Sequence, residues 1–114
     1  MAILKISTDF SPFPGARYLS DGEESGQKFY EERLKQAFQD AIANGEKLTV
    51  DLDDTAGYAS SFLDESFGRL AEDFTVATVL KNIEIISNDE PDWKEKILTD
   101  YIPNAPKRKK RVAA

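Results

Sequence analysis

The sequence contains no cysteine and no histidine. The missing cysteine excludes disulfide bonds, thiolate zinc sites and a cysteine nucleophile. The missing histidine removes the commonest general base and the commonest metal ligand, so a Ser-His-Asp triad cannot form. Because much catalytic chemistry is thereby excluded, we expect a protein that is not an enzyme and that has no catalytic residue, cofactor or metal ion.

Long apolar runs are also missing. No segment approaches the ~20 apolar residues that a membrane-spanning helix needs, and residues 1–7 lack the apolar length of a signal peptide. We therefore expect a cytoplasmic protein without a membrane partner. The chain has 114 residues, of which 40% are hydrophobic and 11% aromatic, which suffices for one domain with its own core.

Charge is divided unevenly along the chain. Lys and Arg number 15 against 21 Asp and Glu, a formal net charge of −6. Five basic residues are consecutive: Lys107, Arg108, Lys109, Lys110 and Arg111. Residues 1–106 therefore carry 10 basic and 21 acidic groups, a net −11 that repels phosphates, and only the basic tail is expected to touch nucleic acid. We expect the domain over residues 1–102 and a flexible basic tail over residues 103–114.

Hydrophobic periodicity predicts alternating strands and helices. Strands are expected over residues 2–7, 47–52 and 83–87, with a short additional strand over 16–19. Helices are expected over 25–43, from 60 or 61 to 74, and from about 90 to 102. Residues 75–81 fit a helical turn or part of a strand. This order predicts an α/β fold with a mixed sheet of about four strands flanked by three to four helices.

Polar residues near the expected helix starts predict local caps. Ser25 is placed to cap the helix over 25–43, because its hydroxyl can accept a hydrogen bond from a first-turn amide. Ser61 and Asp64 have the spacing of a capping box, with Asp in place of the usual Glu or Gln. Arg17 lies near Gly22 and Gly26, whose spacing is not that of a phosphate-binding loop. We expect a tight turn there in which Arg17 pairs with an acid.

Two segments carry a recognisable pattern: residues 17–29, RYLSDGEESGQKF, and residues 50–70, VDLDDTAGYASSFLDESFGRL. Together they resemble a prokaryotic family of STAS-like domains of uncharacterised function. The most specific part is Ser60-Ser61-Phe62-Leu63-Asp64-Glu65 with Gly68. The resemblance covers most of residues 2–102 and implies a single STAS-like domain.

That family is in turn similar to the anti-sigma factor antagonists, which switch partners when a serine kinase of the histidine-kinase-like class phosphorylates them. The phosphorylated serine opens a helix in an Asp-Ser-Ser-Gly-Leu motif, and the matching stretch here is Ala59-Ser60-Ser61-Phe62-Leu63. The resemblance implies a regulatory interaction module of bacterial or phage origin, with a histidine-kinase-like ATPase as partner. Ser60 and Ser61 are then candidate phosphorylation sites, or they only cap the helix.

The expected partner-binding surface is the loop and helix start around this motif, with Asp54, Tyr58, Ser60, Ser61, Phe62, Asp64 and Glu65. Tyr58 and Phe62 are expected to be partly exposed, as suits an interface. Phe10 and Phe13 either join it or cover the core. Because the acidic residues lack the spacing of a calcium-binding loop, we expect a solvated rim rather than a metal site. Two other functions stay open: an acidic inhibitor that mimics nucleic acid, and a small-ligand- or metal-binding domain.

Overall fold

The computed structural model describes residues 2–107. Its sheet contains β1 (Ala2–Lys5), β2 (Leu48–Asp51) and β3 (Ile83–Ile86), in the order β1-β2-β3. Both neighbouring pairs are parallel. The expectation of a mixed sheet of about four strands is therefore corrected to three parallel strands within the described residues.

The short strand expected over residues 16–19 accounts for the difference. Ala16 forms only an isolated bridge with Ser25, and the chain then turns through η1 (Leu19–Asp21). The preceding loop contains Pro12 and Pro14, which lack the N–H groups that a strand ladder needs. This part of the chain is consequently a loop held by single hydrogen bonds, such as Gly15 N to Glu24 O at 3.0 Å.

The helices lie largely where periodicity places them. The helix expected over 25–43 is a continuous run of α2 (Gly26–Phe29), η2 (Tyr30–Leu34) and α3 (Lys35–Ala43). The predicted cap is confirmed, since Ser25 Oγ accepts a hydrogen bond from Lys28 N at 3.0 Å. The other helical segments are α1 (Ile6–Asp9), α4 (Ser60–Phe74), α5 (Val76–Asn82), α6 (Pro91–Lys96), η3 (Ile97–Tyr101) and η4 (Ala105–Lys107). Residues 75–81, which the sequence left open, are thus mostly the helix α5.

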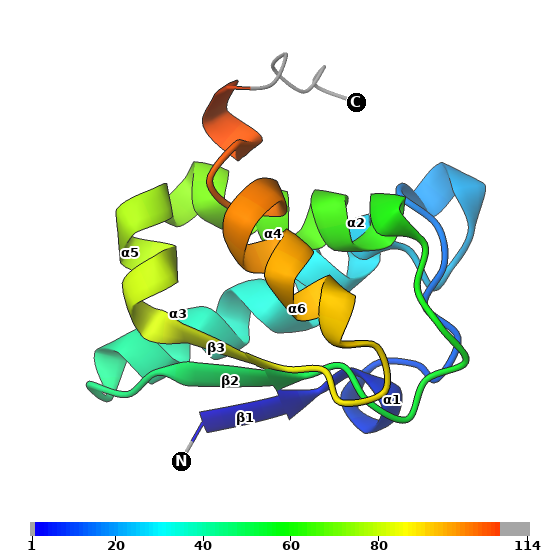
Figure 1. The fold of residues 1–114 in the computed structure, drawn as a ribbon, viewed down its shortest axis with the longest axis horizontal. Helices are drawn as coiled ribbons and strands as arrows, with labels where there is room; N and C mark the ends of the chain where they lie inside the picture. The colour runs from blue at the N-terminus through cyan, green and yellow to red at the C-terminus, as the bar shows by residue number, and fades with distance from the viewer. Residues whose placement is uncertain (1, 108–114) are drawn as a thin grey trace.

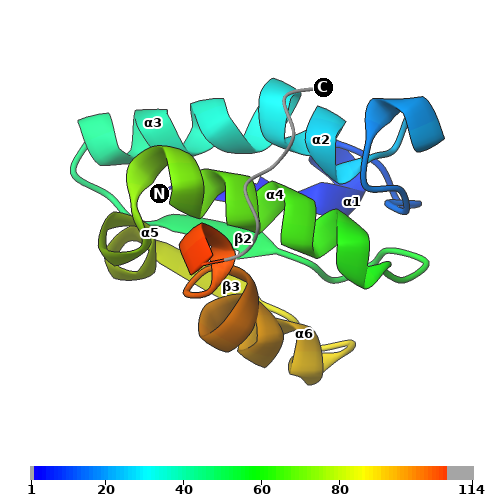
Figure 2. The same ribbon diagram turned by 90° about the horizontal axis from the view of Figure 1, so that it is seen from above.

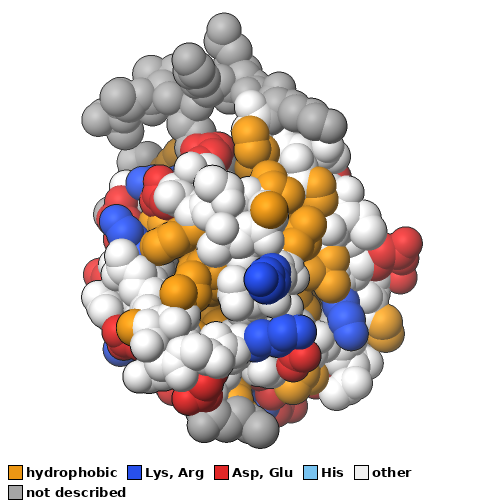
Figure 3. All heavy atoms as spheres, turned by 90° about the vertical axis from the view of Figure 1, so that its left-hand side faces the viewer, with side chains coloured by type: hydrophobic (Ala, Val, Ile, Leu, Met, Phe, Trp, Pro, Cys, Tyr) orange, Lys and Arg blue, Asp and Glu red, His pale blue; other side chains and the backbone are white. Residues whose placement is uncertain are grey.

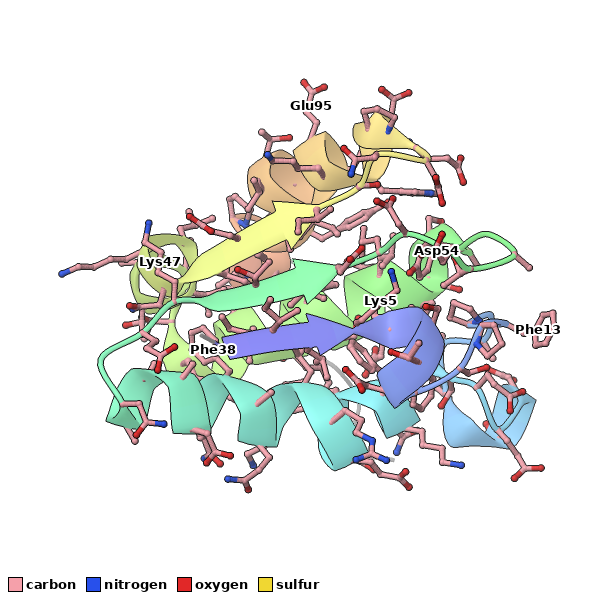
Figure 4. The ribbon with its side chains drawn as sticks, turned by 90° about the horizontal axis from the view of Figure 1, so that it is seen from below. Lys5, Phe13, Phe38, Lys47, Asp54 and Glu95 are labelled. Carbon is pink, nitrogen blue, oxygen red and sulfur yellow. The ribbon has the colours of Figure 1, made fainter. Side chains whose placement is uncertain are left out.

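The helices cover one face of the sheet. Seen from above, α3, α4 and α6 lie side by side over the strands (Figures 1 and 2). Seen from below, the strands face the viewer with the helices behind them (Figure 4). The strand residues alternate accordingly: Leu48 and Val50 are buried, whereas Thr49 and Asp51 are half-buried on the other face. A parallel sheet usually has both faces covered, so this open face is unusual.

The core lies between the sheet and the helices. Its fully buried members include Leu34, Phe38, Leu63, Phe67, Leu70 and Ile97, which were expected from helical spacing. Aromatic rings tie the elements together, with Phe29 and Phe62 stacked at 5.6 Å and Phe38 and Phe74 at 5.1 Å. Each such pair contributes about 0.5–1.5 kcal/mol beyond its buried area.

The packed chain continues past residue 102, because Ala105 is only 2% exposed. The turn η4 lies against the outer side of α4 (Figure 1). The predicted flexible tail falls mostly on residues 108–114, which lie outside the described residues. No helix within residues 2–107 combines the length and the apolar composition needed to cross a bilayer.

Candidate interaction surface

The carboxyl ends of the three strands bring polar residues to one edge of the sheet. Lys5 ends β1, Asp51 ends β2, and the loops after β2 and β3 carry Asp53, Asp54 and Asp89. In open parallel sheets, ligands commonly bind outside this edge. Figure 4 shows Lys5 and Asp54 close together there.

Lys5 links the ends of two strands. Its Nζ donates a hydrogen bond to Asp54 Oδ2 at 2.7 Å and lies 3.4 Å from Asp51 Oδ2. The hydrogen bond to Asp54, together with the two negative charges, raises the pKa of Lys5 above its ordinary value. Lys5 thereby balances part of the acidic charge of the edge, as a solvent-screened ion pair of modest energy.

The loops after β2 and β3 are joined by hydrogen bonds. Asp53 accepts hydrogen bonds from Asp89 N at 2.9 Å and from Asn88 Nδ2 at 3.0 Å. Asp54 N donates in return to Asp89 Oδ2 at 2.9 Å. In the part of the chain that the structure describes, no three His, Cys, Asp or Glu side chains form a group that could hold a metal ion. The carboxylates here are engaged by protein donors.

Tyr58 and Phe62, which were both expected to be partly exposed, have different environments. Tyr58 is half-buried, and its hydroxyl donates to Leu52 O at 2.7 Å. Burial raises the pKa of Tyr58 above its ordinary value, so the group stays protonated and able to donate. Phe62 is fully buried beneath Phe10, with ring centroids 6.0 Å apart. The placement of Phe62 on the partner surface is therefore corrected, because it belongs to the core.

Glu65 is also fully buried, so its expected place on the partner surface is likewise wrong. Its carboxylate lies 3.6 Å from Arg17 Nη1 and 3.4 Å from Arg69 Nη1. These two cations offset the desolvation of the buried charge. Glu65 thus fastens the loop before α2 to α4.

Asp64 joins the same cluster from the second turn of α4. Its Oδ2 lies 2.9 Å from Arg17 Nη1, which confirms that Arg17 pairs with an acid. The predicted capping box does not form, because the N-cap of α4 is Ala59, with no side-chain cap. The capping geometry fails because the helix begins one residue before Ser61.

The two candidate phosphorylation sites open α4. Ser60 is exposed and Ser61 is half-buried. The first amides of α4 form the positive end of the helix dipole, and the N-cap side chain accepts no hydrogen bond from them. An added phosphate on Ser60 would meet these amides, so the position is chemically suited to such a modification.

The sequence left one exposed aromatic ring undecided, and this ring lies in a loop that is hydrogen-bonded to the loop before α4. Phe13 is 68% exposed (Figure 4), whereas Phe10 covers the core against Phe29 at 5.3 Å. A hydrogen bond from Ala56 N to Pro12 O, 2.8 Å long, joins the two loops. We call the group formed by Phe13, Asp54, Tyr58, Ser60, Ser61 and Asp64 the loop surface. The signal for Phe13 is an aromatic residue between two prolines, outside any periodic stripe.

Comparison with known protein families finds a match. The model of a family described as a STAS-like domain of unknown function matches residues 25–93. This range runs from the cap of α2 into α6 and includes most of the loop surface. No curated protein matches the chain, and no solved structure does.

Proposed function

The chain belongs to the STAS-like domains of unknown function, and from this premise we propose that it is a non-enzymatic regulatory module that binds another protein through the loop surface. The observation that carries the proposal is the exposed ring of Phe13, 68% accessible, on an edge that also presents Asp54 and Ser60. Exposed aromatic rings next to charged groups are typical of interaction sites.

The chemistry of the loop surface specifies its partner. Covering a Phe side chain fully contributes about 1.5–3 kcal/mol, so Phe13 would supply much of the affinity. Asp54 is exposed and adds negative charge to the loop surface. A suitable partner presents an apolar pocket beside basic residues, since complementary charge speeds association and orients the complex.

The loop surface is also rigid before it binds. The hydrogen bond from Asp89 N to Asp53 holds the loop after β2 against the loop after β3. The hydrogen bond from Ala56 N to Pro12 O holds it against the loop that carries Phe13. The hydroxyl of Tyr58 fixes the loop to Leu52 O. Preorganised loops lose less conformational entropy on association, which favours a protein interface over a passive connection.

We further propose that phosphorylation of Ser60 regulates this contact, with a histidine-kinase-like ATPase as the partner that transfers the phosphoryl group. The γ-phosphoryl of ATP would pass to Ser60 Oγ, releasing ADP and the hydroxyl proton. Ser60 is the better acceptor of the two serines, because it is exposed and Ser61 is half-buried. The added charge of about −2 would join Asp54 and Asp64 on the loop surface and would strengthen its attraction for a partner that presents basic residues.

The test is a quantitative affinity purification from cells of the source organism with matched variants. Phe13→Ser and Asp54→Asn alter the loop surface. The controls Leu80→Ser and Glu95→Gln likewise remove one apolar side chain and one negative charge, at exposed positions elsewhere. The proposal predicts one partner that the two control variants retain and the two loop-surface variants lose at least tenfold. Equal recovery with all four variants would contradict it. Mass spectrometry of the same samples reads phosphate on Ser60.

A further inference from the structure

The outer edge of β1 lies on another part of the molecule. Among the described residues β1 pairs with β2 alone, so its other side is a free sheet edge. The amide of Lys5, the last residue of β1, is already hydrogen-bonded, because it donates to Asp9 Oδ2 at 2.8 Å. Because alternate residues of a strand direct their N–H and C=O groups to the same side, the outward-facing backbone groups between Ala2 and Leu4 are those of Ile3. Such an edge presents backbone N–H and C=O groups that can pair with another strand.

A hollow of about 230 Å³ lies beside this edge, between β1 and α3. Its lining includes Ala2, Ala37, Asp40, Ala41, Glu46 and Leu48. The alanines create the space, because larger side chains at 37 and 41 would fill it. Figure 4 shows α3 alongside the outer side of β1, with no strand beyond β1. A hollow below the ~300–1,000 Å³ of drug-sized ligand sites suits one or two small side chains.

An added strand would use both sides of this edge. Its backbone would pair with β1, and its side chains would point alternately into the hollow and onto the open face of the sheet. On that open face Ile3 is 54% exposed. Apolar side chains reach the surface between charged ones at the end of the molecule where the strands begin (Figure 3).

The charge around the hollow is negative. Asp40 and Glu46 line it, and the carboxyl end of α3 adds the negative end of a helix dipole. The nearest cation in sequence, Lys47, is directed to Glu84 of β3 at 3.9 Å. The complementary strand is therefore basic, with small apolar side chains for the hollow.

The chain contains one such segment, Arg108-Lys109-Lys110-Arg111-Val112-Ala113. We propose that the β1 edge binds this segment of a second copy of the chain. The short reach of the segment opposes binding within one copy. The turn Ala105–Lys107 and β1 lie on opposite sides of the molecule (Figure 1), which measures 35 × 32 × 25 Å, and five extended residues from Lys107 cover at most about 18 Å.

The resulting contact is head-to-tail. Each copy offers its basic segment to the next and receives one from another, so association yields chains or closed rings. Because the contact depends on basic and acidic groups near the surface, it weakens with salt. The site is separate from the loop surface at the other end of the strands, so either assignment can fail alone.

The test is complementation between two full-length variants. The edge variant Ala37→Arg with Asp40→Lys fills the hollow and reverses its charge. The tail variant Lys109→Glu, Lys110→Glu and Val112→Asp removes the complementary segment. The control Gln39→Lys changes an exposed residue of α3 outside the hollow. Circular dichroism establishes that each variant is folded.

Sedimentation velocity then gives the mass of each sample. We expect association of the wild type and the control that weakens at least tenfold in dissociation constant from 50 to 500 mM salt. Each of the two other variants stays monomeric alone, and their equimolar mixture restores a 1:1 dimer through one edge and one tail. A monomeric wild type at all concentrations, or a mixture that does not associate, overturns the proposal.

Discussion

Arg17 Nη1 lies 2.9 Å from Asp64 Oδ2 and 3.6 Å from Glu65 Oε1. This arginine belongs to the loop before α2, and the two carboxylates belong to the second turn of α4. The contact thus fastens the most irregular part of the chain to the helix that opens the loop surface. Since Glu65 is fully buried, its charge depends on this arginine and on Arg69.

Replacing Arg17 by Gln should lower the free energy of unfolding by about 1–3 kcal/mol, because the buried carboxylate of Glu65 loses a charged partner. Arg69 remains 3.4 Å from Glu65, which limits the loss. Urea unfolding at pH 7 measures the effect. The control is Arg33→Gln at an exposed position, and equal losses for the two variants would show that the ion pairs are unimportant.

The start of α2 packs directly against α4 at Gly26. A Cβ atom at this position would overlap the carbonyl oxygen of Phe62. Gly26→Ala should therefore destabilise the protein by about 1–3 kcal/mol, the usual range for overpacking. Gly15→Ala is the matched control, because its Cβ would meet only Phe13 O at 4.0 Å. Thermal unfolding of both variants distinguishes a close approach from a general cost of losing glycine.

Alkaline pH should destabilise the protein through two tyrosines. Burial raises the pKa of Tyr30, which also donates a hydrogen bond to Asp73, and burial raises the pKa of Tyr58. In the unfolded chain a tyrosine ionises near pH 10. Above that pH the unfolded state binds fewer protons than the folded state, so stability is complete below about pH 10 and falls as pH rises.

Tyr58→Phe isolates one of these groups. The variant lacks the hydrogen bond to Leu52 O and should be less stable than wild type at pH 8. Its stability should fall less between pH 8 and pH 11, because it has no phenol to ionise at that position. Urea titrations at the two pH values provide the comparison. An identical fall in the free energy of unfolding from pH 8 to pH 11 in the two proteins would mean that Tyr58 titrates alike in the folded and unfolded states.

The N-terminus of α4 offers a stabilising change. Ala59 is the N-cap, with φ −87° and ψ 141°, and it contributes no side-chain hydrogen bond. Asp at this position can accept from a first-turn amide and meets the positive end of the dipole, so Ala59→Asp should add about 0.5–2 kcal/mol. The control Ala56→Asp places the same charge in the exposed loop. An equal gain there would indicate a general charge effect.

Hydrophobic periodicity was sufficient to predict most helices and strands, because the spacing of their apolar residues depends only on neighbouring positions in the sequence. The spacing of Leu63, Phe67 and Leu70 predicted α4, and all three are fully buried. Ser25 could be predicted as a cap for the same reason, since its partner Lys28 N is three residues away. The strand expected over residues 16–19 failed because four residues carry little periodic information and two prolines precede them.

The errors at the site have a different origin. Phe62 is buried because Phe10, far away in sequence, folds over it. Glu65 is buried because Arg17 crosses from another loop to pair with it. Both facts depend on long-range contacts that no local pattern encodes. For the same reason the sequence did not reveal that Ala37, Ala41 and Leu48 enclose a hollow beside β1.

Site-specific photo-crosslinking tests the central claim, that the loop surface binds a partner, most directly. A photoreactive phenylalanine analogue replaces Phe13 in one version of the protein and Glu95, exposed on α6, in another. After irradiation in cells of the source organism, we predict a discrete adduct with one protein at position 13 that is absent at position 95. No adduct at position 13, or the same adduct at both positions, would contradict the account.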